Sequence, residues 1–368
     1  MILVQQTPPV AAGRIVSQPR TSDPSNRRYD LDLFRFLAAL AVLLFHYTFR
    51  GFAADGLTIM PFAPGWRIAK YGYLAVEFFF MISGYVILMS ARNSTAGAFA
   101  INRARRLYPA FWLCCTLTFL CGRLSHDPVY SVPAGIYLKN MTLGLEFFKV
   151  PPVDGVYWSL VIELRFYILV FLVLLAGRMA KIRVYLFAWA LLSLLLLARP
   201  VFHLNSWFVP EYAGFFISGC CFYLVEVEGW TPLRFLTLLC SFALAIISAL
   251  RNASDFTLHY HQTFRPAVVV TAIGLFFLLF WLFASGRTKR LASPWFAILG
   301  AVSYPLYLLH ENLGFMLFNN LYPRFSPGVL TLAAGSLMIL ASWLVCRYFE
   351  KRGQLLLKRF LERLMAWI

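Results

Sequence analysis

The chain has 368 residues, of which 60% are hydrophobic and only 13% are charged, and its formal net charge is +17. Soluble globular proteins are about half apolar and about a quarter charged, so this composition excludes an ordinary soluble enzyme and indicates a polytopic membrane protein. The positive charges are scattered between apolar runs, which excludes a nucleic-acid-binding protein and fits the excess of Lys and Arg on the cytosolic side of membrane proteins.

The first 28 residues are polar and contain four prolines, which predicts a disordered cytosolic tail. The apolar run that follows is too long for a cleaved signal peptide and has no small-residue cleavage site. We therefore expect this run to remain as the first membrane span.

Ten apolar runs are long enough to cross a membrane, given that a spanning helix needs about 20 residues. They cover residues 31–49, 71–90, 107–122, 158–176, 184–198, 210–226, 233–250, 265–285, 294–316 and 328–346. The sequence thus predicts an all-α fold, a polytopic helical bundle with about ten transmembrane helices in a domain at residues 29–346. The longest loop, at about residues 123–157, leaves no room for a soluble domain.

The distribution of Lys and Arg predicts the orientation of this bundle. With the N-terminus in the cytosol, the cytosolic regions carry 21 of these residues and the outer regions carry ten, so both termini are expected to be cytosolic. After the last span, residues 347–368 alternate basic and apolar residues at helical spacing. This pattern predicts an amphipathic helix on the inner face of the membrane.

Seven cysteines lie in or at the ends of apolar runs. Their odd number and their spacing match neither a disulfide framework nor a zinc site, so we interpret them as small packing residues. No metal is predicted.

Arg35 and His46 are ionisable residues within the first span. They are eleven residues apart, which is about three helical turns, or roughly 16 Å along one helical face. Because ionisable groups are costly in hydrocarbon, residues of this kind mark candidate functional sites.

Four spans carry His or Glu at a similar expected depth, in the outer half of the membrane. These residues are His46, Glu77, Glu163, His310 and Glu311. A His beside a carboxylate forms a general-base pair, and His is also a competent acyl acceptor. Two other interpretations remain open, namely hydrogen bonds between packed helices and a proton relay in a transporter.

The inner side carries a different cluster. The segment FAINRARRLYPAFW places Arg103 and Arg106 one turn apart at the start of the third span, with Arg105 between them, and Arg35 lies at the same level. Arg side chains suit phosphate, which they can bind with two hydrogen bonds. The alternative is an ordinary cluster of positive charge at the cytosolic face.

The order of five motifs resembles the acyltransferase 3 family of integral membrane acyltransferases, which O-acylate carbohydrates at the bacterial cell surface. The similarity extends from about Tyr29 to Cys346. The motifs are Arg35 followed after ten residues by His46, the stretch YLAVEFFFMISGYVI with Glu77 and Ser83, the segment RARRLYP with Arg103 and Arg106, the block from Trp158 to Tyr167 with Glu163, and the segment SYPLYLLH from Ser303 to His310.

This resemblance implies a reaction. An acyl-CoA on the cytosolic side, usually acetyl-CoA, would donate its acyl group to a hydroxyl of a carbohydrate or glycolipid. His46 would be the catalytic residue, and Glu163 would orient it or activate the acceptor hydroxyl. The CoA phosphates would be bound, or the donor channel lined, by Arg35, Arg103 and Arg106.

The resemblance also implies supporting roles for Glu77, Ser83, Trp158, Tyr167 and His310, with His310 behind the catalytic residue rather than in contact with substrate. Some members carry an additional extracellular esterase-like domain, which we do not expect here, so the whole transfer is expected inside the bundle, in a bacterial cytoplasmic membrane. Exopolysaccharide, O-antigen and lipid-linked oligosaccharide all remain open as acceptors.

The competing hypothesis is a transporter of a solute or lipid-linked glycan that uses the same buried His and Glu residues. Such a protein is expected to have repeat symmetry and spans broken by Gly or Pro at matching positions. The sequence has neither, which favours the enzyme.

Overall fold

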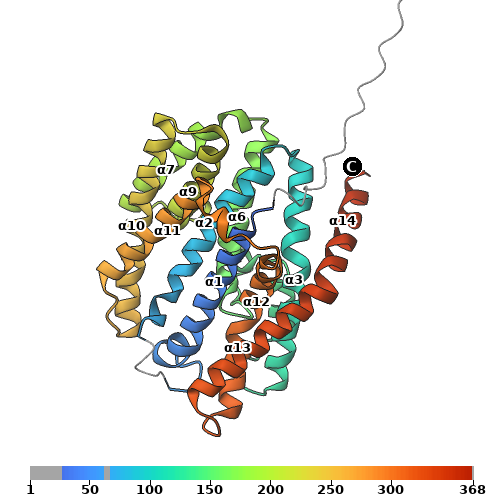
Figure 1. Cartoon of the computed structure of the whole chain (residues 1–368). Helices are drawn as coiled ribbons and strands as arrows, with labels where there is room; N and C mark the ends of the chain where they lie inside the picture. The colour runs from blue at the N-terminus through green and yellow to red at the C-terminus, as the bar shows by residue number, and fades with distance from the viewer. Residues whose placement is uncertain (1–26, 62–66, 367–368) are drawn as a thin grey trace, which may run out of the picture.

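A computed structural model describes residues 27–61 and 67–366 of the chain. The described residues form helices joined by loops and contain no strand (Figure 1). The predicted disordered tail falls outside the described residues, except for Arg27 and Arg28. The last two residues of the predicted C-terminal helix also fall outside them.

Ten long helices make up the bundle. They are α1 (Tyr29–Phe45), α2 (Leu74–Ala91), α3 (Ala96–Leu124), α6 (Tyr157–Leu175), α7 (Ile182–Ala198), α9 (Pro210–Glu228), α10 (Pro232–Tyr260), α11 (Pro266–Ala284), α12 (Phe296–Leu321) and α13 (Pro327–Leu344). The other helices are α4 (Ala134–Asn140), α5 (Leu145–Phe148), α8 (Phe202–Phe208) and α14 (Lys351–Ala366). The described residues also form two π-helices, η2 (His46–Ala54) and η7 (Val345–Glu350), and three 3₁₀ helices, η4 (Ala69–Tyr73), η5 (Met179–Lys181) and η6 (Arg287–Leu291).

The prediction of an all-α polytopic membrane bundle is confirmed. Each of the ten predicted runs coincides with one long helix, and nine helical segments of the described chain are long and apolar enough to cross a membrane. Helix α12, the ninth predicted run, is not among these nine. It carries His310 and Glu311, and both side chains are fully buried. Helix α12 is therefore a more polar helix held inside the bundle, where it packs on α1 and α13.

A proline inside α12 removes one backbone hydrogen bond, and a side chain replaces it. Pro305 has no N–H to donate to the carbonyl four residues earlier, which belongs to Ala301. The thiol of Cys346 donates to that carbonyl instead, at 3.3 Å. This cysteine therefore satisfies a backbone group, in addition to the packing role expected from the sequence.

Helices α2 and α9 pack against each other with their backbones in contact. A Cβ atom added at Gly84 would collide with the carbonyl oxygen of Phe216, and one added at Gly219 would collide with the carbonyl oxygen of Met81. Small residues let transmembrane helices approach to backbone contact, and here glycine is required on both helices. The crossing fixes α2, which carries Glu77 and Ser83, against the rest of the bundle.

Replacing Gly219 with valine is expected to destabilise the protein by about 1–3 kcal/mol or more, because the added atoms overpack a backbone contact. Thermal unfolding of the detergent-purified protein measures this loss. The matched control is Gly274→Ala on α11, where an added Cβ meets nothing within 4 Å. The control should retain or slightly raise stability, and equal losses in the two variants would contradict the assigned contact.

Helix α13 continues through η7 into α14 as one long helix, and α14 leans along α3 (Figure 1). Glu350 in η7 accepts a hydrogen bond from Arg106 of α3 at 2.7 Å. The residues predicted to form the C-terminal amphipathic helix are thus helical in η7 and α14. Their position at the inner face of the membrane stays a prediction.

Candidate active site

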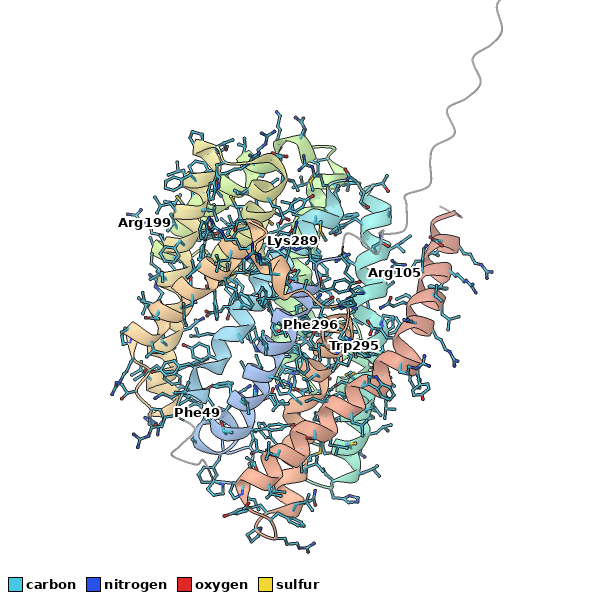
Figure 2. The ribbon with its side chains drawn as sticks, in the orientation of Figure 1. Phe49, Arg105, Arg199, Lys289, Trp295 and Phe296 are labelled. Atoms are coloured by element: carbon cyan, nitrogen blue, oxygen red, sulfur yellow. The ribbon has the colours of Figure 1, made fainter. Side chains whose placement is uncertain are left out.

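Helix α1 changes character at His46. It ends at Phe45, and the chain continues as the π-helix η2 from His46 to Ala54. Figure 2 labels Phe49 of this segment near the lower end of the bundle. π-Helical turns are rare and occur frequently at functional sites. His46 follows directly after the buried residues Val42, Leu43 and Phe45 of α1. It therefore lies inside the bundle, with only 4% of its surface exposed.

Two histidines contact each other in a fixed protonation pattern. The Nδ1 atom of His310 lies 2.9 Å from the carbonyl oxygen of Tyr307, and Nδ1 of His46 lies 2.8 Å from that of Val42. Carbonyl oxygens only accept hydrogen bonds, so both Nδ1 atoms carry protons. Nε2 of His310, 3.0 Å from Nδ1 of His46, is therefore an acceptor. It follows that Nε2 of neutral His46 carries a lone pair.

A guanidinium and a carboxylate surround this lone pair. Nη1 of Arg50 donates to this lone pair on Nε2 of His46 at 3.1 Å and to Oε1 of Glu311 at 2.9 Å. Oε2 of Glu311 lies 3.5 Å from Nε2 of His46, at ion-pair distance. Arg50 is held in turn by Asp55, whose Oδ2 accepts from Nε at 2.7 Å. A base, its counter-charge and a cation thus meet at one point.

The loop before α6 closes over Glu311. A Cβ atom at Gly155 would stand 2.7 Å from Oε1 of Glu311, so glycine is needed there to admit the carboxylate. The neighbouring side chain, Asp154, is fully buried and accepts a hydrogen bond from the backbone N–H of Asn312 at 3.1 Å. Burial, together with the nearby Glu311 carboxylate, raises the pKa of Asp154 well above its usual range. The loop therefore positions α12 at the site.

A cavity of about 250 Å³ opens beside His46, at the end of the bundle where α1 ends and where α2 and α6 begin. Its lining combines polar and aromatic side chains. The residues that bear on the chemistry are His46, Arg50, Tyr73, Glu77, Trp158, Tyr212, Asn252, Phe256, Tyr260 and Tyr307.

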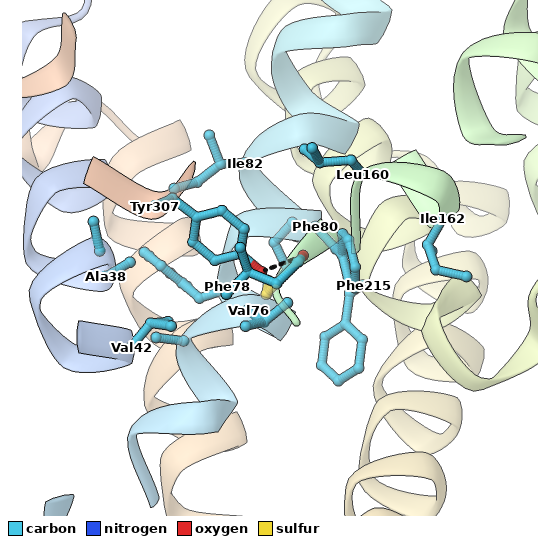
Figure 3. Close-up of a cluster of buried hydrophobic side chains, with 14 of the residues drawn as sticks. Ala38, Val42, Val76, Phe78, Phe80, Ile82, Leu160, Ile162, Phe215 and Tyr307 are labelled. Carbon is cyan, nitrogen blue, oxygen red and sulfur yellow. Dashed lines mark hydrogen bonds between the residues drawn. The ribbon is translucent and has the colours of Figure 1, made fainter. Parts of the chain in front are cut away.

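A second, smaller cavity of about 60 Å³ lies closer to the N-terminal end of α1. Arg35, Ser83 and Glu163 line it. Val76 and Tyr307 line both cavities, so these two side chains form the boundary between them. Figure 3 shows Tyr307 between α1, marked by Ala38 and Val42, and α6, marked by Leu160.

The expectation that Glu163 orients His46 differs from what the structure shows. Glu163 accepts hydrogen bonds from Ser83 and from Tyr167, the latter at 2.7 Å, and faces the second cavity. The carboxylate beside His46 belongs to Glu311. Counting residues from the membrane surface gave Glu163 and His46 similar depths but could not give the tilt of α6 or the direction of its side chains.

The three arginines expected at a phosphate lie in the same region but in different environments. Within the described chain, the buried Nε atoms of Arg35 and Arg103 have no hydrogen-bond partner. Arg106 instead pairs with Glu350. Arg35 and Arg103 each interact electrostatically with Glu163, which partly offsets their charge. Their unpaired N–H groups remain available to an anion.

The remaining predicted site residues lie at the larger cavity, around Glu163 or behind His46. Glu77 and Trp158 line the larger cavity, Ser83 and Tyr167 hold Glu163, and His310 contacts His46 from behind. Among the described residues, no group of three or more His, Cys, Asp or Glu side chains is arranged to hold a metal ion.

Sequence reasoning missed Arg50 and Asp154. Arg50 is one of the ten Lys and Arg residues of the outer regions, and nothing in that charge count distinguishes it, although it stands four residues after His46, a spacing that places two side chains on one helical face. Asp154 carries no comparable signal. Its burial arises from the fold of the loop onto α12.

Comparison with known proteins identifies the family of this chain. Residues 28–347 match the family model Acyl_transf_3, described as an acyltransferase domain. An O-acetyl transferase of Shigella phage Sf6 is 33% identical over 154 residues, which are 38% of this chain and 43% of that protein. A putative membrane-bound transacylase, BcsY, of Komagataeibacter xylinus is 28% identical over 191 residues, 48% of this chain and 44% of that protein.

The matched regions span less than half the length of each of these two relatives, and no solved structure matches the chain significantly. The family match, in contrast, extends over nearly the whole helical bundle and includes His46, Arg50 and Glu311. The chain is an integral membrane protein that belongs to the Acyl_transf_3 family of acyltransferase domains.

Proposed function

We propose that this protein transfers an acyl group, in the first instance acetyl, from acyl-CoA to a hydroxyl of a carbohydrate or glycolipid inside its helical bundle. The observation that carries the proposal is the position of His46 in the wall of a cavity, with Nδ1 2.8 Å from the carbonyl oxygen of Val42 and 3.0 Å from Nε2 of His310, an arrangement that assigns the lone pair to Nε2 of His46. The family match and the O-acetyl transferase relative support the reaction class.

The donor phosphates bind near Arg35 and Arg103, whose unpaired N–H groups suit an anion. The narrow pantetheine arm follows the second cavity past Val76 and Tyr307, and the thioester reaches His46. The excess of Lys and Arg at the N-terminal end of α1 supports a cytosolic position for this end and for both termini, in a bacterial cytoplasmic membrane.

In the chemical step, Nε2 of His46 takes the proton of the acceptor hydroxyl. The oxygen attacks the thioester carbonyl carbon, and the C–S bond breaks as the tetrahedral intermediate collapses. The CoA thiolate takes the proton from the imidazolium, which restores neutral His46. Glu311 balances the transient positive charge on the ring, and the Arg50 guanidinium stabilises the developing oxyanion.

Deletion of the gene, followed by mass spectrometry of surface glycans and glycolipids, tests the function directly. The deletion strain is expected to lose one O-acyl group from one class of glycan, and the wild-type gene is expected to restore it. An unchanged acylation pattern in the deletion strain would reject the proposed function.

Replacing Arg103 with alanine is expected to weaken CoA binding by about 10- to 100-fold, since a hydrogen bond to a charged group contributes about 1.5–3 kcal/mol. The measurement is equilibrium binding of CoA to the detergent-purified protein. Arg105→Ala is the matched control, because Arg105 (Figure 2) lies two residues away on α3 and, unlike Arg103, has no buried Nε without a partner within the described chain. Equal CoA affinity in the two variants would refute the phosphate site.

A further inference from the structure

The larger cavity contains two polar atoms without partners. Within the described chain, Oε2 of Glu77 and the hydroxyl of Tyr73 are buried and have no hydrogen bond. Their side chains are only 2% and 8% exposed. A buried polar group without a partner costs about 1–3 kcal/mol, so such atoms call for an explanation. Since both residues line the cavity, a ligand bound there is within their reach.

These two atoms lie on one helical face. Tyr73 is the last residue of η4, and Glu77 follows four residues later in α2, so their side chains are neighbours. The amide of Asn252, on α10, also lines the cavity and forms a hydrogen bond with the Glu77 carboxylate. The cavity therefore offers carboxylate, phenol and amide groups to the same occupant.

The remaining walls are aromatic. Trp158 and Tyr212 lie with their ring centroids 5.4 Å apart, and Phe256 and Tyr260 line the cavity from α10. Aromatic faces carry partial negative charge and attract the weakly positive C–H groups of a sugar ring. Sugar hydroxyls, in contrast, require strong hydrogen-bond partners. A neutral pyranose ring presents both kinds of surface.

The volume limits the size of the ligand. Drug-sized ligands occupy pockets of about 300–1,000 Å³, and this cavity has about 250 Å³, so it is too small for an oligosaccharide. His46 lies in the same lining as Glu77. A ring held at Glu77 can therefore present another of its hydroxyls to Nε2 of His46.

We infer that Glu77, Tyr73 and the aromatic wall bind a single neutral pyranose ring of the acceptor, with Glu77 accepting a hydrogen bond from a ring hydroxyl that is not acylated. This inference rests on the proposed function for its link to His46. The binding itself is measurable without any acyl transfer.

The test titrates methyl glucoside, galactoside, mannoside and rhamnoside into the purified full chain without donor, with binding followed by saturation-transfer NMR. Cyclohexanemethanol is the matched probe, because it has an apolar ring of similar size with a single hydroxyl. At least one glycoside is expected to bind the wild-type protein. Glu77→Gln should weaken that binding by about tenfold or more, and Tyr73→Phe by a smaller factor, as expected for hydrogen bonds to a charged and a neutral group.

Two controls separate lost binding from lost folding. CoA affinity should remain at the wild-type value in both variants, and Tyr223→Phe on α9, outside the cavity, should bind the glycoside normally. Glycoside affinity unchanged by Glu77→Gln, or no glycoside binding by the wild type, would overturn the inference. Glycoside binding without acyl transfer from acetyl-CoA would instead reject the proposed function and leave the sugar site intact.

Discussion

Replacing His46 with alanine is expected to lower acyl transfer by about 10²–10⁴-fold, the usual contribution of a positioned general base. The structure supplies the reason. Nδ1 of His46 donates to Val42 and His310, so Nε2, which accepts a hydrogen bond from Arg50, is the ring nitrogen whose lone pair can take a proton. The measurement is the steady-state rate of acetyl transfer from acetyl-CoA to the acceptor glycoside, with purified protein.

Loss of activity in this variant must be separated from misfolding, because His46 is buried. CoA affinity reports on the intact bundle and is expected to match that of the wild type, since the expected phosphate ligands Arg35 and Arg103 are unchanged. His203→Ala removes an exposed histidine on α8 and should retain full activity. A His46→Ala protein that transfers acyl groups at the wild-type rate would remove His46 from the chemistry.

Replacing Glu311 with glutamine is expected to lower kcat by about 10- to 10³-fold, with a smaller effect on the KM for either substrate. The carboxylate stands 3.5 Å from Nε2 of His46, and an opposite charge at that distance favours the imidazolium by about 1–4 kcal/mol. Glutamine has nearly the same shape, so the variant removes the charge and retains the packing against Gly155.

Glu163→Gln is the matched comparison for this prediction. Glu163 faces the cavity with Arg35, so its replacement is expected to change the KM for the acyl-CoA more than kcat. Steady-state kinetics of both variants, with each substrate varied in turn, separates the two roles. A large kcat loss in Glu163→Gln together with normal turnover in Glu311→Gln would reverse the assignment.

The sequence was sufficient to predict the long helices and to place Arg35 and His46 toward opposite ends of the first span. Hydrophobic runs of membrane length have few alternative folds, because every backbone group must be paired in lipid. The same cost makes each intramembrane charge conspicuous, which is why the sequence alone marks Arg35, His46, Glu77 and His310 as candidate site residues.

The pairing of these residues required the three-dimensional structure. Glu163 and Glu311 are equivalent by depth along the chain, and only the packing of α12 on α1 decides that Glu311 meets His46. The π-helix at His46 and the burial of Asp154 depend on contacts distant in the sequence. No local pattern encodes them.

Sealed vesicles provide the most direct test of the central claim, that the bundle connects a donor site at Arg35 and Arg103 with a base at His46 near its other end. Radiolabelled acetyl-CoA is added outside vesicles that contain the protein, and the methyl glycoside that binds is trapped inside. We predict that labelled acetyl glycoside accumulates inside vesicles with the wild-type protein and not with His46→Ala. Labelled product formed only when donor and acceptor share one side of the membrane would contradict the account.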